Sequence, residues 1–394
     1  MADTLDLLAV SAATRTSSRS ERIIGRRDAT AVVIGAGPAG LATARELAAR
    51  DVAYRLFERG PDIGHVWRNL YDSLRLHTGK HLSALPGLRF PAATPLFPAK
   101  SDFVDYLEHY RAAFGIHAET GVDVKAAQPG TDGAGWVLET NCGPVAANAL
   151  VVATGIVSNP VIPDFPDRDR FRGEVIHSAE YRRPDIYGRR RLLVVGCGNS
   201  GGEIASELAS AGAQVTIAVR SGANVVPLTI LGIPIQYISF LIRKLPRSAQ
   251  DVIVGIVRTL TDLRRGPPVL PRPAYSPLDA IPLIGFQLVD AIRAGRIRVR
   301  PGIQAFTESG IRFEDGEQQQ FDSVILATGF RPALEPLNGL IRTDARGFAV
   351  RTDRVTSADQ RRLWFVGHNY SATGGLQNIA TDAALAADRV AQSR

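Results

Sequence analysis

The 394-residue chain is poor in sulfur, with one methionine and two cysteines, Cys142 and Cys197. The cysteines form no C-x-x-C motif, which argues against the dithiol chemistry of the pyridine-nucleotide disulfide reductases. Cys197 lies inside a glycine-rich turn, which is a poor place for a disulfide. Two isolated thiols are typical of a reducing compartment, so we expect a cytoplasmic protein.

Lysine is also scarce, and most of the 46 basic residues are arginines. The formal net charge is +7, but the basic residues are scattered and no cluster of them alternates with aromatic residues. We therefore expect no nucleic-acid partner, and anionic cofactors explain the positive charge more simply. The seven histidines show no metal-ligand spacing, so no metal site is predicted.

The N-terminus lacks the basic start of a secretory signal, because Asp3 and Asp6 precede its short apolar run. Residues 1–28, rich in Ser, Thr and Arg, are predicted to be a flexible N-terminal arm. Apolar residues make up 45% of the chain and charged residues 22%, which is ordinary for a globular enzyme of two domains.

The stretch Ala31–Gly40, AVVIGAGPAG, places an apolar strand before glycines spaced G-x-G-x-x-G, and a helical pattern follows. Such glycines permit a tight turn, let a pyrophosphate approach the backbone, and let helix and strand pack closely. Glu58 ends the next strand, at about the 20-residue distance where an acid binds a ribose hydroxyl. The predicted FAD contacts here are Gly35, Gly37, Pro38, Ala39, Gly40, Glu58 and Arg59.

The same pattern recurs at Leu192–Gly201, LLVVGCGNSG. Here the following strand ends at Arg220 instead of an acid, and a basic residue suits the 2′-phosphate of NADPH. Two such units predict two dinucleotides, FAD and NADPH. The predicted NADP contacts are Gly196, Gly198, Asn199, Ser200, Gly201, Arg220, Ser221, Thr328 and Gly329.

Two more apolar strands, at 149–155 and 323–329, both end in Ala-Thr-Gly and lead into proline-bearing crossings. We interpret them as the borders between two domains. The predicted fold class is therefore α/β, with two Rossmann-like domains and the NADPH domain inserted into the FAD domain. The predicted bounds are 29–160 and 322–394 for the two parts of the FAD domain, and 161–321 for the NADPH domain.

Several other segments are predicted to lie beside the flavin. Gly64–Arg68 follows the ribose-binding strand and suits a loop along the flavin, with an ordinary turn as the alternative. A helix from Gln377 follows Gly367 and could point its N-terminus at the flavin, with plain packing as the alternative. The further predicted FAD contacts are Val66, Trp67, Arg68, His77, Val124, Thr154, Gly367 and Gln377.

Residues 225–242 form the longest apolar stretch, but Pro227 and Pro234 interrupt it, which argues against a membrane-spanning helix. We predict that residues 222–275 form an apolar lid or channel wall. The alternative is contact with a membrane surface, since basic residues follow the stretch.

The segment FRGEVIHSAEY matches the fingerprint F-x-G-x-x-x-H-x-x-x-Y at Phe171, Gly173, His177 and Tyr181. With the two glycine turns, it makes the chain resemble the class B flavin-containing monooxygenases over nearly its whole length. We interpret the fingerprint as a domain linker and His177 as a structural residue. The closest likeness is to the YUCCA-type members, in the segments Leu76–Lys80, Gly196–Gly201, Val299–Ile303 and Ser323–Arg331.

This resemblance implies an NADPH- and O2-dependent monooxygenase that forms a C4a-(hydro)peroxyflavin and oxygenates a small organic molecule. The implied reaction is decarboxylation of a 2-oxo acid of the indole-3-pyruvate type, or S- or N-oxygenation. His77 stands where animal-type members carry an active-site Asn, which favours the YUCCA-like substrate. His77 and Lys80 are the catalytic candidates, with cofactor or backbone contacts as the alternative.

Other functions remain open at this point. A Baeyer–Villiger monooxygenase has a related fingerprint, and an NADPH oxidase or reductase without oxygen transfer would carry the same glycine turns. A non-enzymatic flavin-bearing sensor is a different class, and the intact second glycine turn argues against it. We expect a small-molecule substrate and O2 as partners and no membrane, and the oligomeric state stays open, a homodimer included.

Overall fold

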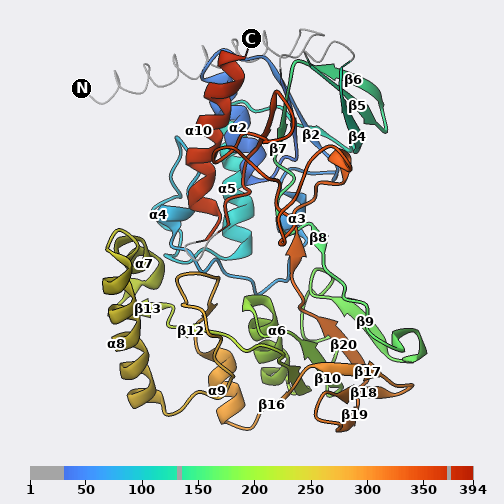
Figure 1. Ribbon diagram of the computed structural model, residues 1–394, viewed down its shortest axis with the longest axis vertical. Helices are drawn as coiled ribbons and strands as arrows, with labels where there is room; N and C mark the ends of the chain where they lie inside the picture. Colours follow the sequence, from blue (N-terminus) through green and yellow to red (C-terminus); the bar gives the residue numbers. More distant parts are fainter. Residues whose placement is uncertain (1–30, 131–134, 371–373, 394) are drawn as a thin grey trace.

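The computed structural model describes residues 31–130, 135–370 and 374–393, so the predicted arm at 1–28 lies outside the described residues. The chain forms two lobes, each built on a five-stranded parallel sheet (Figure 1).

The first sheet has the strand order β22-β7-β1-β2-β3. Its strands are β1 (Ala31–Ile34), β2 (Tyr54–Glu58), β3 (Glu119–Thr120), β7 (Ala149–Val152) and β22 (Leu363–Phe365). All residues of β1 and β7 are buried, because both faces of the sheet are covered. One face packs on α2 (Pro38–Ala48), α5 (Lys100–Ala113) and α10 (Leu376–Gln392). The other face meets the antiparallel sheet of β4 (Val124–Pro129), β5 (Trp136–Thr140) and β6 (Gly143–Ala147).

The second sheet has the order β16-β11-β10-β20-β9. Its strands are β9 (Glu174–His177), β10 (Arg191–Val195), β11 (Gln214–Ala218), β16 (Ile297–Arg300) and β20 (Ser323–Leu326). One face packs on α6 (Asn199–Ser210) and α9 (Gln287–Arg293). The other packs on the antiparallel strands β17 (Ile303–Phe306), β18 (Gly310–Phe313) and β19 (Gln318–Gln320).

The two sheets repeat one plan. In each, the strand before the glycine turn is central, the next strand in sequence lies on one side, and the strand ending in Ala-Thr-Gly lies on the other. A helix follows the glycine turn, and a small antiparallel sheet is inserted before the Ala-Thr-Gly strand in both lobes. The predicted α/β class with two Rossmann-like units is therefore confirmed.

The chain crosses between the lobes twice, and the two crossings run together. β8 (Asn159–Pro160) pairs antiparallel with β21 (Phe330–Arg331). The hydroxyl of Thr154 donates to the carbonyl of Ala333 at 2.6 Å, so the end of one border strand is tied to the opposite crossing.

One predicted boundary differs from the structure. The sequence placed the return to the FAD domain at residue 322, whereas β20 is a strand of the second sheet, between β10 and β9. All four residues of β20 are buried, which either sheet would allow, and its pairing with β10 on one side and β9 on the other holds the strand in the second lobe. The return therefore follows Leu326.

A third part covers the space between the lobes. It consists of β12 (Val225–Val226), β13 (Thr229–Ile230), β14 (Ile233–Pro234), α7 (Ile235–Ile242), α8 (Arg247–Arg265) and β15 (Leu283–Ile284). We call residues 225–284 the lid. The remaining short elements are α3 (His65–Arg68), α4 (Lys80–Ser83), η1 (Arg168–Arg170) and η2 (Glu335–Leu337). Among the described residues, no helix is both long and apolar enough to cross a bilayer.

Candidate active site between the two lobes

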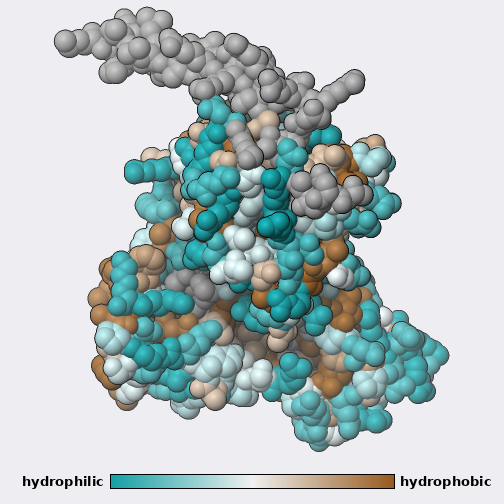
Figure 2. Space-filling model, turned by 45° about the horizontal axis from the view of Figure 1, so that its top comes forward, coloured by the Kyte–Doolittle hydropathy of each residue, from teal (hydrophilic) through white to brown (hydrophobic). Residues whose placement is uncertain are grey.

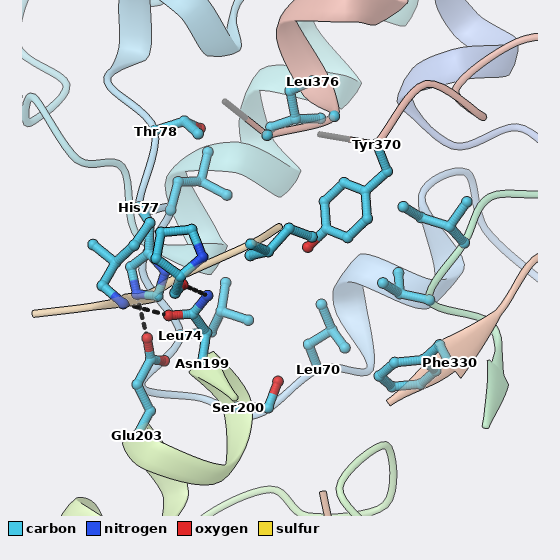
Figure 3. Close-up of a pocket in the computed structure, with 18 of the residues that line it drawn as sticks. Leu70, Leu74, His77, Thr78, Asn199, Ser200, Glu203, Phe330, Tyr370 and Leu376 are labelled. Carbon is cyan, nitrogen blue, oxygen red and sulfur yellow. Dashed lines mark hydrogen bonds and ion pairs between the residues drawn. The ribbon is translucent and has the colours of Figure 1, made fainter. Parts of the chain in front are cut away.

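A cavity of about 810 Å³ lies where the two lobes and the lid meet (Figure 3). Both glycine-rich turns reach it, the first through Gly35 and Gly37 and the second through Asn199 and Ser200. Fourteen of the residues predicted from the sequence line this cavity: Gly35, Gly37, Pro38, Ala39, Glu58, Arg59, Val66, Trp67, His77, Val124, Thr154, Asn199, Ser200 and Gly367.

The two glycine turns have the same geometry. Gly35 and Gly196 have φ of +100° and +103°, which an L side chain rarely adopts. A Cβ on the third glycine, Gly40 or Gly201, would lie 1.7 or 2.0 Å from a carbonyl oxygen of its own turn. A Cβ on the second glycine, Gly37 or Gly198, would meet nothing within 4 Å. Each turn therefore requires its first and third glycines for the fold and leaves open space at its second.

Glu58 braces the first turn from the end of β2. Its carboxylate accepts from the backbone N–H of Ala36 and of Gly60, both at 2.9 Å. The carboxylate thus reaches the glycine turn and also lines the cavity. Trp67 in α3 lines the same cavity and packs edge-on against Phe103, with ring centroids 4.4 Å apart. A short helix therefore stands where the sequence suggested a loop.

A polar cluster joins the two lobes across the cavity (Figure 3). His77 Nε2 forms an ion pair with Glu203 of α6. The other oxygen of the Glu203 carboxylate accepts from the Tyr71 hydroxyl at 2.5 Å. Burial, and then the charge of Glu203, raise the pKa of Tyr71, so this hydroxyl keeps its proton. The cluster ties two side chains of the first lobe to the helix that follows the second glycine turn.

Of the predicted residues that do not line this cavity, Lys80, Arg68 and Gln377 have long side chains that lie elsewhere. The ammonium of Lys80 donates to the carbonyls of Ala92 and Thr94, at 2.9 and 2.6 Å, and so anchors the proline-bearing segment above it. Arg68 pairs with Glu108 of α5. Gln377 lines a separate cavity of about 450 Å³. The position of a residue in the sequence does not show which way a long side chain turns.

Two of the predicted NADP contacts, Asn199 and Thr328, form hydrogen bonds with other parts of the protein. The amide of Asn199 donates to the carbonyl of Pro282 at 3.0 Å and accepts from the N–H of Ile284 at 2.8 Å, so it ties the turn to the lid. Arg220 and Ser221 are exposed just beyond the carboxyl end of β11. The Thr328 hydroxyl donates to the carbonyl of Val161 in the first crossing.

The fingerprint residues lie away from the cavity and pack the second lobe. Tyr181 is fully buried and donates to Glu207 at 2.9 Å. A Cβ on Gly173 would lie 2.4 Å from the ring of Phe171. Nδ1 of His177 accepts from the N–H of Ala179 at 3.1 Å, and burial lowers its pKa. These contacts suit structural residues at the start of the inserted domain.

Sequence reasoning missed Glu203, Tyr71 and Arg258. Arg258 lines the cavity from α8, and its guanidinium donates to the neutral amide of Asn224 at 2.6 Å. No motif marks these positions. Only the period of helix α6 could have placed Glu203 on the same face as Ser200, one turn earlier.

The residues present suit two dinucleotides. Each turn offers an open second glycine and the start of a helix of eleven or twelve residues, which is the arrangement that binds a pyrophosphate. Within the described part of the chain, no group of three or more His, Cys, Asp or Glu side chains could hold a metal ion.

Comparison with known proteins gives the same picture. The family model "Flavin-binding monooxygenase-like" matches residues 28–342. The indole-3-pyruvate monooxygenase YUCCA1 of Oryza sativa subsp. japonica is 37% identical over 310 residues, which cover 76% of each chain. Among solved structures, a flavin-containing monooxygenase from Stenotrophomonas maltophilia has a TM-score of 0.71 at 23% identity and covers 91% of this chain and 97% of its own. Cyclohexanone monooxygenase from Rhodococcus sp. Phi1, bound to NADP+, has a TM-score of 0.72 at 19% identity, with 92% and 84% covered.

Proposed function

Because the chain belongs to the flavin-binding monooxygenase-like family, we propose that it is an NADPH- and O2-dependent FAD monooxygenase that oxygenates a small organic substrate. The observation that carries this proposal is the pair of matching glycine turns that reach one cavity. FAD would lie on the first turn, with Glu58 at its ribose, and NADPH on the second, with Arg220 near its 2′-phosphate. When reduced by NADPH, FAD supplies the electrons that activate dioxygen.

The protein's own part is to position and to shield. Trp67, Val66 and Leu376 give the cavity apolar walls in the first lobe, and the lid adds more from α8. Such walls exclude water, which would otherwise favour loss of the activated oxygen as hydrogen peroxide. The Glu203 carboxylate holds His77 at the cavity wall, where the imidazole can meet a polar group of substrate or cofactor.

For the substrate we propose an aromatic 2-oxo acid, the class named for the plant relative. Arg258 supports this choice, since its guanidinium reaches the cavity and donates to a neutral amide, that of Asn224. A guanidinium at the wall of a cavity favours an anionic ligand, and a carboxylate fits the guanidinium fork. We therefore assign the substrate carboxylate to Arg258.

The test is anaerobic reduction of the purified protein with NADPH, followed by rapid mixing with oxygenated buffer. A coupled monooxygenase would return to the oxidised flavin spectrum slowly without substrate and faster with it, and would release little peroxide. Immediate return with stoichiometric hydrogen peroxide, unchanged by any substrate, would instead identify an oxidase or reductase.

The substrate class is tested separately. Indole-3-pyruvate, a thioether, an amine and a cyclic ketone are offered in turn, and product is followed by mass spectrometry. With Arg258→Met, we expect the KM for the 2-oxo acid to rise roughly tenfold, the loss of about 1.4 kcal/mol of binding, with the KM for a neutral thioether unchanged. Equal effects on both substrates would remove Arg258 from carboxylate recognition.

A further inference from the structure

The outer face of the lid is unusually apolar. Of the fifteen large apolar side chains that are exposed among the described residues, nine lie between residues 231 and 263. They include Leu231, which is 97% exposed, and Leu263, which is 76% exposed. The full set is Leu231, Ile233, Phe240, Leu241, Leu245, Val252, Ile256, Leu260 and Leu263. Figure 2 shows hydrophobic surface at the edge of the lower lobe where α7 and α8 lie in Figure 1.

Helix α8 is apolar on two opposite faces. Ile253, Val254 and Val257 face inward and line the central cavity. Val252, Ile256, Leu260 and Leu263 follow the spacing of one helix stripe on the outside and are exposed by half or more. No residue of this 19-residue helix is fully buried. The inward stripe lines the cavity, whereas no described residue covers the outward stripe, which stays exposed.

The charge around this outer face has one sign. Residues 231–265 contain six basic residues and two acidic ones, Asp251 and Asp262. Two of the basic residues, Arg258 and Arg265, line the central cavity, so the outer face has the other four, which are all exposed: Arg243, Lys244, Arg247 and Arg264. Both acids are paired with arginines, Asp251 with Arg247 and Asp262 with Arg272. Lys244 lies over the ring of Phe240, at 4.9 Å from its centre, so an ammonium sits beside an exposed apolar side chain. This combination is what an interfacial helix presents to anionic headgroups and the acyl chains beneath them.

From this charge and this apolar stripe we propose that α7 and α8 dock on the surface of an anionic lipid bilayer. The exposed apolar side chains enter the headgroup boundary, and the basic residues meet the lipid phosphates. A second copy of the chain is the less suitable occupant, because a twofold contact would bring the same positive face against itself. The inner stripe of α8 would then place the central cavity directly behind the docked helix.

The experiment uses the full chain and sedimented vesicles. We expect binding to vesicles of phosphatidylcholine with phosphatidylglycerol, much weaker binding to phosphatidylcholine alone, and loss of binding at high salt. The triple variant Ile256→Gln, Leu260→Gln, Leu263→Gln should lower the vesicle partition coefficient by roughly tenfold or more. Far-ultraviolet circular dichroism and flavin content check that this variant is folded.

A matched control changes three apolar residues elsewhere that are about half exposed. Val137, Ile162 and Ile186 are 46%, 47% and 54% exposed, and all lie outside the lid. The variant Val137→Gln, Ile162→Gln, Ile186→Gln should bind vesicles as the unchanged chain does. The proposal is overturned if the unchanged chain does not bind anionic vesicles, or if both triple variants bind alike. A concentration-dependent dimer that only the α8 variant abolishes, without vesicle binding, would make this face a subunit interface instead.

Discussion

Gly37 and Gly198 are the residues at which fold and cofactor binding can be separated. Both have extended backbone conformations that alanine adopts, with φ of −78° and −70°, and an added Cβ would meet no protein atom within 4 Å. A pyrophosphate that approaches the turn would meet that methyl group. We expect Gly198→Ala to keep its FAD and a Tm within about 2 °C, while the Kd for NADP+ rises roughly tenfold or more.

The reciprocal variant is its control. Gly37→Ala should lower FAD occupancy and leave the NADP+ affinity of the folded protein unchanged. Calorimetric titration with NADP+ and the flavin-to-protein absorbance ratio report the two sites independently. Gly40→Ala should not fold, because its Cβ would lie 1.7 Å from a carbonyl oxygen. Loss of both cofactors in either second-glycine variant would contradict the assignment of one dinucleotide to each turn.

His368 makes the stability of the chain depend on pH. It is 1% exposed, neither ring nitrogen has a hydrogen-bond partner among the described residues, and burial lowers its pKa to about 3. The unfolded chain therefore binds a proton at this residue between about pH 6.5 and pH 3 that the folded chain does not. The free energy of unfolding therefore includes the full contribution of His368 above pH 6.5. As the pH falls from 6.5 toward 3, this contribution is lost, by up to about 1.4 kcal/mol per pH unit.

The variant His368→Leu tests this dependence. The imidazole packs against the rings of Phe348 and Phe365, so an apolar side chain suits the position. Urea unfolding from pH 6.5 to pH 4.5 should show a shallower fall in the free energy of unfolding for His368→Leu than for the unchanged chain. Parallel pH profiles for the two proteins would show that His368 is not the residue that takes up the proton.

The sequence predicted the positions of site residues inside motifs better than the positions of those outside them. The turn geometry of the glycines and the position of Glu58 beside them agree with the sequence pattern, because both depend on backbone conformation and on distance along the chain. Glu203 was missed because its partners, His77 and Tyr71, are more than 120 residues away in sequence. Lys80 makes the backbone contacts that were the alternative to a catalytic role, because a long flexible side chain can turn to nearby carbonyls as readily as to a cavity.

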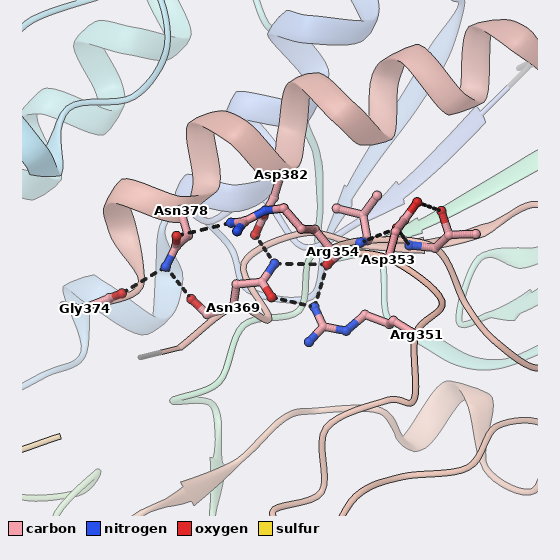
Figure 4. Close-up of polar contacts among 9 residues, drawn as sticks. Arg351, Asp353, Arg354, Asn369, Gly374, Asn378 and Asp382 are labelled. Atoms are coloured by element: carbon pink, nitrogen blue, oxygen red, sulfur yellow. Dashed lines mark hydrogen bonds and ion pairs between the residues drawn. The ribbon is translucent and has the colours of Figure 1, made fainter. Parts of the chain in front are cut away.

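Among the elements, α10 is held to the first lobe by a buried carboxylate (Figure 4). Asp382 is fully buried and accepts from Arg354 Nε at 2.9 Å and from Asn369 Nδ2 at 2.7 Å. Burial raises the pKa of Asp382, so its charge depends on these two donors. Asp382→Ala removes the one charged acceptor that these two donors share and should lower the free energy of unfolding by about 2–4 kcal/mol in urea titrations.

The same helix offers the control. Asp388 pairs with Arg50, but its side chain is 52% exposed. Asp388→Ala should change the free energy of unfolding by less than about 1 kcal/mol, since water screens an exposed pair. If both substitutions lower the free energy of unfolding by the same amount, α10 is stabilised by its apolar face alone and the buried network contributes little.

Element boundaries show where local sequence signals end. The buried residues of α5 follow a helical period only from Phe103 onward, whereas the helix starts at Lys100. The carboxylate of Asp102, in the first turn, accepts from the N–H of Ala99 at 2.8 Å, so this contact and not the apolar period marks the start. In the lid, apolar content predicted a cover, and the two helices and their orientation follow from packing against both lobes.

At the scale of the whole molecule, the internal repeat made the fold predictable. Two glycine turns and two Ala-Thr-Gly strands predicted two units, and each unit has the same strand layout. In each unit the strand that leads into Ala-Thr-Gly pairs with the strand before the glycine turn, so both units can be located from their motifs. The exact return point did not follow, since β20 belongs to the second sheet although its apolar sequence fits either one.

The Glu203 carboxylate links the two lobes at the cavity, since it binds Tyr71 and His77 of the other lobe. A substitution of Glu203 therefore tests whether this link affects flavin reduction. Glu203→Gln keeps the side-chain volume and an acceptor for the Tyr71 hydroxyl, but it removes the negative charge beside the His77 imidazole. The pair is about three-quarters buried, so we expect a loss of about 1 kcal/mol, or roughly fivefold in the rate of flavin reduction at saturating NADPH. Anaerobic stopped-flow measures this rate. Glu119→Gln, which removes the negative charge from a pair with Arg55 that does not line the cavity, should leave the rate unchanged. A purely structural Glu203 would lower Tm and leave the reduction rate intact, whereas a residue that positions the two lobes for hydride transfer slows reduction with little change in Tm.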